Sequence, residues 1–125
     1  MRDFAIQLTH RAGELARVCD ALSRTGVNIK SVAALTVDNQ VLLRLIPDDV
    51  EAARSGLREA NIRFEESEVL TVLVENKAGE LAGVSARLAQ AGVNLLAVYV
   101  TGVEGDLVEL AIVPDDVKKA KKVLE

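Results

Sequence analysis

The sequence offers few side chains that could carry out catalysis. It contains one histidine, His10, and one cysteine, Cys19, and no Ser–His–Asp set or phosphate-cradling loop followed by arginine. A histidine needs partners to hold a metal ion, and a lone cysteine excludes an internal disulfide or a cysteine-based zinc cluster. We therefore expect a protein that is not an enzyme and, in particular, not an acylphosphatase-like hydrolase. We also expect it to use no cofactor and no metal.

Composition and length exclude further classes of protein. The chain has 125 residues, of which 50% are hydrophobic, 2% aromatic and 27% charged, and its net charge is −4. Nucleic-acid binding normally requires a basic excess and, on RNA-binding sheets, aromatic residues, so we expect no nucleic-acid partner. No apolar run approaches the roughly 18 residues of a membrane span, and the N-terminus has no signal-peptide core, so we expect no membrane association and a cytoplasmic location.

The strongest pattern in the sequence is an internal repeat. Residues 11–29 and 77–95 share 10 identities in 19 positions at an offset of 66 residues. The segment Ile-Pro-Asp-Asp-Val at 46–50 recurs as Val-Pro-Asp-Asp-Val at 113–117, at an offset of 67. Two matching blocks in the same order indicate a duplicated unit. The single added residue is expected in the hairpin turn between the two middle strands, where insertions are tolerated.

Each copy predicts the element order β-α-β-β-α. Alternating apolar residues predict a first strand with one buried face, and apolar residues at helical spacing predict helices over 13–25 and 79–91. The residues expected on these inner faces are Phe4, Ile6 and Leu8 with Leu15, Val18 and Leu22 in the first copy, and Leu70, Val72 and Val74 with Leu81, Val84 and Leu88 in the second.

Local signals complete the two copies. Gly26 and Gly92 are expected in the left-handed conformation that ends a helix. The Pro-Asp-Asp segments predict second helices, with capping-box spacing between Asp48 and Glu51, and Ile62–Glu66 predicts a fourth strand in the first copy. Two helices on one face of an antiparallel sheet define an α+β ferredoxin-like sandwich. We therefore predict tandem sandwiches, 1–67 as βαββαβ and 68–125 as βαββα without its final strand.

The stretch from each first strand through Ala-Gly-Glu-Leu to Gly-Val-Asn resembles the signature of the ACT domain, a small ligand-binding module of amino-acid metabolism. The resemblance covers both copies apart from the missing final strand. It departs from many family members at Ala12 and Ala78, which stand where proline is common. It implies a non-catalytic regulatory protein that binds a free amino acid at an interface between two domains.

Carried over residue by residue, the resemblance implies contacts from two loops and two asparagines. The loop residues are His10, Arg11, Ala12, Gly13, Glu14 and Leu15, and Asn76, Lys77, Ala78, Gly79, Glu80 and Leu81; the asparagines are Asn28 and Asn94. A helix N-terminus can hold an α-carboxylate, and an amide side chain can meet both ends of a zwitterion. We expect loop 76–81 with Asn28 to bind more tightly than loop 10–15 with Asn94, because His10 replaces an amide.

Each of these residues also has an interpretation that involves no ligand. Gly13 and Gly79 permit a tight strand-to-helix turn, and Asn28 and Asn94 follow a helix end, where asparagine is common. His10 is expected to be solvated. The alternative function is therefore a ligand-free module that dimerises or docks on a metabolic enzyme. In either case we expect a homodimer or larger, with second strands paired between chains and one long, bent strand shared by the copies near 62–75.

Overall fold

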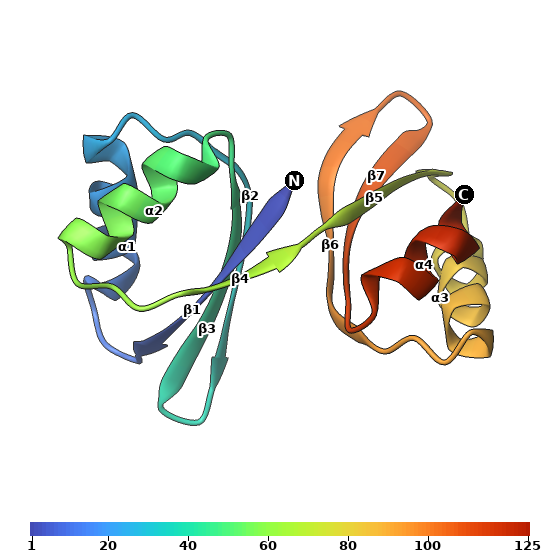
Figure 1. Cartoon of the computed structure of the whole chain (residues 1–125), viewed down its shortest axis with the longest axis horizontal. Coiled ribbons are helices and arrows are strands. Elements are labelled where there is room, and N and C mark those ends of the chain that lie inside the picture. Colours follow the sequence, from blue (N-terminus) through green and yellow to red (C-terminus); the bar gives the residue numbers. More distant parts are fainter. The chain divides into compact units, whose positions relative to one another are not determined.

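The computed structural model describes all 125 residues, which divide into two compact units (Figure 1). The first unit comprises Arg2–Ser67, and the second comprises Glu68–Glu125 together with Met1. The chain forms β1 (Arg2–Thr9), α1 (Glu14–Arg24), β2 (Ile29–Val37), β3 (Gln40–Pro47), α2 (Val50–Glu59) and β4 (Glu65–Glu68), then β5 (Leu70–Glu75), α3 (Glu80–Gln90), β6 (Leu95–Glu104), β7 (Leu107–Pro114) and α4 (Val117–Leu124).

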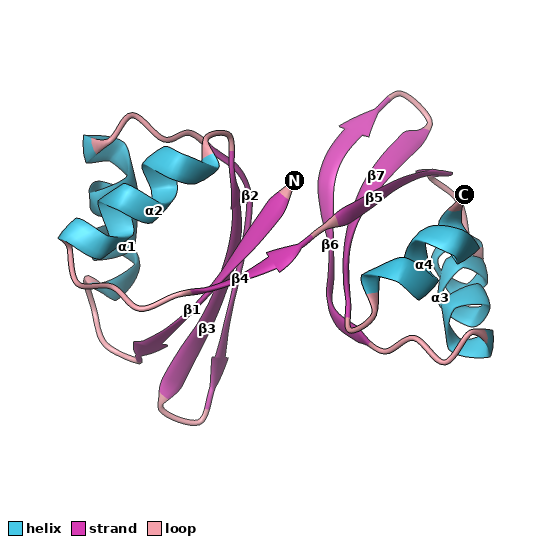
Figure 2. Cartoon of the chain, viewed as in Figure 1, coloured by secondary structure: helices cyan, strands magenta, loops and turns pink.

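Each unit is an antiparallel sheet with two helices on one face (Figure 2). The strand order is β2-β3-β1-β4 in the first sheet and β5-β7-β6 in the second. In the first unit Phe4 pairs with Leu45 and Ile6 with Leu43, and all four side chains are buried beneath the helices. This arrangement confirms the predicted tandem ferredoxin-like α+β fold, including the helices expected over 13–25 and 79–91.

The helices begin in two different ways. Gly13 and Gly79 precede α1 and α3 in the left-handed conformation, with φ of 90° and 91°, and neither helix has a side-chain cap. By contrast, α2 begins at Asp49, whose carboxylate accepts a 3.0 Å hydrogen bond from the Ala52 N–H, and Asp116 caps α4 likewise. The capping box predicted from Asp48 is therefore wrong by one residue, because the second aspartate of the pair takes the cap position.

The predicted inner face of the first helices is wrong at one position in each copy. Val18 and Leu22 are buried as expected, but Leu15 is 47% exposed, as Leu81 is 50% exposed in the second copy. The buried stripe of α1 instead runs through Glu14, Val18, Ala21 and Leu22. Leu15 follows Glu14 by one residue and therefore lies about 100° away from it around the helix, to one side of the buried stripe.

The extra residue of the second copy is not in a turn. Both hairpins have turns of the same length, since Val37 pairs with Gln40 and Glu104 with Leu107. The pairing of β6 with β7 shifts register between Val100 and Gly102, so Thr101 is the inserted residue. The expectation of a longer turn is therefore wrong: a β-bulge takes up the residue instead.

The fourth strand begins later than predicted, at Glu65. Asn61 has φ of 57° and the Ile62 N–H donates to the Leu57 carbonyl at 2.9 Å, so these residues still close the end of α2. The long, bent strand predicted near 62–75 is present over 65–75 as two strands, β4 and β5, with the single residue Val69 between them. Phe64, just before β4, packs on Phe4 with ring centroids 5.1 Å apart.

An ionic cluster fixes β4 to the first unit. The Glu66 carboxylate accepts hydrogen bonds from the Arg54 Nε at 2.6 Å and from the Arg2 Nε at 3.3 Å. The hydrogen bond from Arg54, with the charges of Arg54 and Arg2, holds the pKa of Glu66 below its ordinary value although desolvation opposes it. The same hydrogen bond raises the pKa of Arg54.

No helix is long and apolar enough to cross a membrane.

Candidate ligand-binding site

Loops 10–15 and 76–81 join the first strand of each unit to its first helix. Their backbones are tied to the neighbouring hairpin turn: the His10 N–H donates to the Asn39 carbonyl at 2.9 Å, and the Asn76 N–H donates to the Asp106 carbonyl at 2.7 Å. The side chains of His10 and Asn76 are both exposed. The two loops therefore hold the same backbone position while presenting different side chains.

The glycines open both loops to an approaching ligand. Only glycine adopts φ near 90° without strain, and a Cβ built on Gly13 or Gly79 would meet nothing within 4 Å. Because α1 and α3 lack a side-chain cap, the N–H groups of their first turns have no partner from a side chain. Such a helix start can bind a carboxylate through its N–H donors and its positive dipole end.

The two helix starts differ in their charged side chains. Glu14 is 8% exposed, and its carboxylate lies 3.0 Å from the Arg17 Nε and 3.6 Å from the Arg11 Nε. In the second unit Gly83 stands in place of Arg17, and Lys77 pairs with Glu75 at 2.8 Å instead. The Glu80 carboxylate consequently has no ion pair, and the start of α3 is less covered than that of α1.

The two asparagines are held by the first aspartate of each Pro-Asp-Asp segment. The Asn28 N–H donates to the Asp48 Oδ1 at 2.9 Å, and the Asn94 N–H donates to the Asp115 Oδ1 at 3.0 Å. The Asn94 side chain is also engaged, since its Nδ2 donates to the Asp115 Oδ2 at 3.2 Å. The Asn28 side-chain amide makes no such bond, so it is the freer of the two.

The structure separates the loop and the asparagine within each unit. In the first unit, loop 10–15 precedes α1, whereas Asn28 follows it, and the 11 residues of α1 span about 16 Å. Figure 1 shows that the chain enters α1 from β1 at one end of the helix and leaves it towards β2 at the other. The predicted residues therefore form two separate clusters in each unit.

Small and apolar residues complete the loops. Ala12 and Ala78 are exposed beside the glycines, and the exposed Leu15 and Leu81 offer apolar surface at the first helical turn. Sequence reasoning missed Asp48 and Asp115 as the residues that hold the asparagines. The repeated aspartate pair is the signal that could have found them, because a helix start needs only one cap.

The sequence matches no known protein-family profile, and no curated protein is significantly similar to it. Solved structures share its fold. Protein BT0572 from Bacteroides thetaiotaomicron has a TM-score of 0.87 and 23% identity, over 98% of this chain and 85% of that chain. The ligand-free regulatory subunit of aspartate kinase from Thermus thermophilus has a TM-score of 0.67 and 15% identity, over 98% and 87%.

A third structure contains ligands. E. coli aspartokinase III in complex with lysine and aspartate has a TM-score of 0.56 and 19% identity, over 98% of this chain and 29% of that chain. At these identities the similarity establishes a shared fold. That fold is used by a regulatory subunit in at least one of the matched proteins.

Proposed function

We propose that this chain is a non-catalytic regulatory protein that binds a free amino acid. The main support for the proposal comes from the start of α3. Gly79 is in the left-handed conformation there, and no side chain caps the helix. No arginine pairs with Glu80, whereas Arg11 and Arg17 pair with Glu14 at the start of α1. The resemblance to ACT domains and the fold shared with an aspartate kinase regulatory subunit support it. Reversible binding of a zwitterion requires no general acid, base or nucleophile.

In the proposed site the ligand carboxylate lies at the N–H groups that begin α3. The side-chain amide of Asn76 and the amide of Asn28 from a neighbouring unit bind the remaining polar groups. Asn28 is preferred to Asn94 because its side chain has no internal partner, whereas that of Asn94 bonds to Asp115. A site made from two units couples binding to their association, which is the requirement for regulation by a ligand.

Calorimetry with the twenty amino acids tests this site. Loss of one hydrogen bond to a charged ligand group costs about 1.5–3 kcal/mol, so Asn76→Ala and Asn28→Ala should each weaken binding roughly 10- to 150-fold. Gln90→Ala removes an exposed amide on the last turn of α3 and serves as the control. Binding that neither asparagine variant weakens would place the site elsewhere, and no binding at millimolar concentration would favour the ligand-free function.

A ligand-free interaction module is the second candidate, and one surface favours it. Strand β2 lies at the edge of its sheet and carries the exposed residues Val32, Leu35 and Val37, of which Leu35 is 64% exposed. A long apolar edge strand is a template for pairing with another chain. We propose that β2 joins two copies as a homodimer. Light scattering should give twice 13.4 kDa, and Leu35→Lys should shift the mass towards that of one chain.

A further inference from the structure

Helix α4 carries four lysines on one side. Figure 1 shows this helix with α3 on one face of the second sheet. Ala120 is buried in the core, whereas the lysines are all exposed; they are Lys118, Lys119, Lys121 and Lys122. At about 100° per residue, three of them lie within about 100° around the helix, and Lys121 extends this arc by about 60°. We call this arc the lysine face. It lies opposite Ala120 and therefore points away from the core.

The charge of the lysine face is poorly neutralised within the chain. Helix α4 contains no acidic residue. Lys121 pairs with Glu68 at 3.3 Å, and the other three lysines have no ion pair. The two aspartates that precede the helix each accept a hydrogen bond from a backbone N–H, at 3.1 Å and 3.0 Å. The lysine face therefore concentrates positive charge on a chain whose net charge is −4.

Two of these lysines lie where helix electrostatics disfavour them. Lys118 and Lys119 are in the first turn of α4, where the positive end of the helix dipole favours acidic residues. The other three helices each have an acidic residue in the first turn, and α4 has none. Lys118 and Lys122 are also four residues apart, so their like charges repel along the helix. Helix stability therefore does not explain the lysine face, which indicates a role outside the helix.

The first unit shows that the fold does not require a lysine face. The positions on α2 equivalent to the three unpaired lysines carry no positive charge; they are Glu51, Ala52 and Ser55. Glu51 instead forms an ion pair with Arg54 on the same helix. Glu51 and Ser55 are exposed although β4 follows α2, so a strand after the helix does not cover these positions. The two units therefore share the helix and differ in the charge of its outer side.

The lysine face fits a few carboxylates better than an extended surface of phosphates. The eight residues of α4 span about 12 Å, which is the length of a short acidic segment. A membrane or a nucleic-acid duplex would also approach Asp115 and Asp116 to within the Debye length of about 8 Å, and these carboxylates would repel it. The apolar residues Val123 and Leu124 pack against the core, so they do not enter a lipid surface.

We propose that the lysine face of α4 docks an acidic segment of a partner protein. Carboxylates of the partner pair with Lys118, Lys119 and Lys122. Lys121 can exchange Glu68 for an acid of the partner, because an exposed ion pair contributes little to stability. Several such contacts together steer the partner to this side of the chain and fix its orientation. The surface shares no residue with the loops or the asparagines of the amino-acid site.

Fluorescence anisotropy of a labelled peptide that alternates glutamate with glycine tests the docking surface. The full chain is titrated into the peptide at about 0.1 M ionic strength, where charges more than about 10 Å apart are screened. The double variant Lys118→Glu/Lys122→Glu should weaken binding at least about tenfold. The control Lys30→Glu/Arg63→Glu makes the same change in net charge at exposed residues of the first unit and should bind like the wild type. A peptide with glutamine in place of glutamate should not bind.

Thermal melts distinguish docking from a structural role of the lysines. Lys118→Glu places an acidic residue in the first turn of α4, four residues before Lys122. Both changes favour the helix, so this variant should melt at least about 2 °C above the wild type while binding the peptide more weakly. A lower melting temperature would show that Lys118 serves the fold and would overturn the reasoning from helix electrostatics.

Four binding results would also overturn the proposal. Two are equal binding by the wild type and the lysine double variant, and no binding at millimolar peptide. The third is tighter binding of phosphatidylserine vesicles or duplex DNA than of the peptide, which would make phosphates the ligand. The fourth is self-association that the double variant abolishes, which would make a second copy the occupant. Calorimetry with amino acids on the same variant keeps this proposal apart from the amino-acid site, whose residues it leaves intact.

Discussion

Two glycines in the middle of helices should respond in opposite directions to the same substitution. A Cβ added to the buried Gly56 of α2 would lie 2.7 Å from the Ala21 carbonyl oxygen and 2.7 Å from the Thr25 Oγ1. A Cβ added to Gly83 of α3 would meet nothing within 4 Å. Gly56→Ala and Gly83→Ala therefore differ in the space available and not in the chemistry of the change.

The expected magnitudes follow from two opposing effects. Replacing a helical glycine by alanine stabilises a protein by about 0.5–1 kcal/mol, because the unfolded chain loses freedom. Gly83→Ala should show this gain. At Gly56 the methyl group overpacks a helix contact, which costs about 1–3 kcal/mol. Thr25 cannot easily turn away, because its hydroxyl donates to the Ala52 carbonyl at 2.9 Å. The two variants should therefore differ by roughly the overpacking cost.

Urea denaturation followed by circular dichroism measures the difference. The slope of the unfolding free energy against urea should be unchanged, since neither variant alters the surface exposed on unfolding. A difference of 1 kcal/mol corresponds to about 4–8 °C in the melting temperature of a unit of this size. If the Gly56→Ala variant were as stable as the Gly83→Ala variant, the reasoning would be refuted. That result would mean that α1 and α2 leave room for a methyl group at position 56.

Two further predictions concern the first unit. Because the Glu66 pKa is depressed by Arg54, the stabilisation by this carboxylate is complete above the ordinary value of 4.5 and is lost as the pH falls below it. Thermal melts between pH 6 and pH 3 should therefore show a smaller fall for Glu66→Gln than for the wild type, with the exposed Glu65→Gln as control. Asp49→Ala removes the cap of α2 and should cost about 1 kcal/mol in unfolding free energy, measured by denaturation. No loss of stability there would contradict the cap.

The fold could be predicted because the same pattern of residues occurs twice in the sequence. Glycines at equivalent positions, such as Gly26 and Gly92 with φ of 75° and 74°, mark helix ends that one copy alone would leave ambiguous. The apolar alternation of Phe4, Ile6 and Leu8 is confirmed by burial of all three side chains. Signals that depend on backbone conformation or on strict periodicity are therefore readable without the structure.

The errors arise where a residue's surroundings decide its role. Leu15 matches the apolar spacing of α1, but it is exposed while the neighbouring Glu14 is buried. Thr101 is inserted in a strand although turns accept insertions more readily. Periodicity describes a single element, whereas these features depend on what packs against it.

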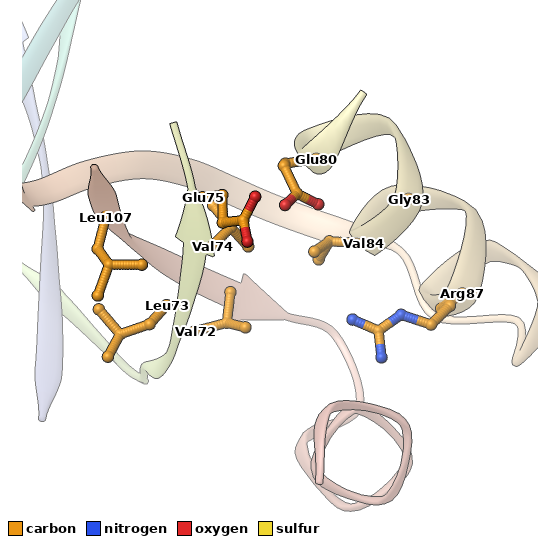
Figure 3. Close-up of a pocket in the computed structure, with 9 residues that line it drawn as sticks. All are labelled: Val72, Leu73, Val74, Glu75, Glu80, Gly83, Val84, Arg87 and Leu107. Carbon is orange, nitrogen blue, oxygen red and sulfur yellow. The ribbon is translucent and has the colours of Figure 1, made fainter. Parts of the chain in front are cut away.

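The two copies differ in the contact between their helices. In the first unit the close approach of α1 and α2 uses small residues at Ala21 and Gly56. The equivalent positions in the second unit are Arg87 and Val123, which are too large for such an approach. A guanidinium cannot be buried between helices without a partner, so Arg87 instead lines a hollow of about 550 Å³ between α3 and β5 (Figure 3).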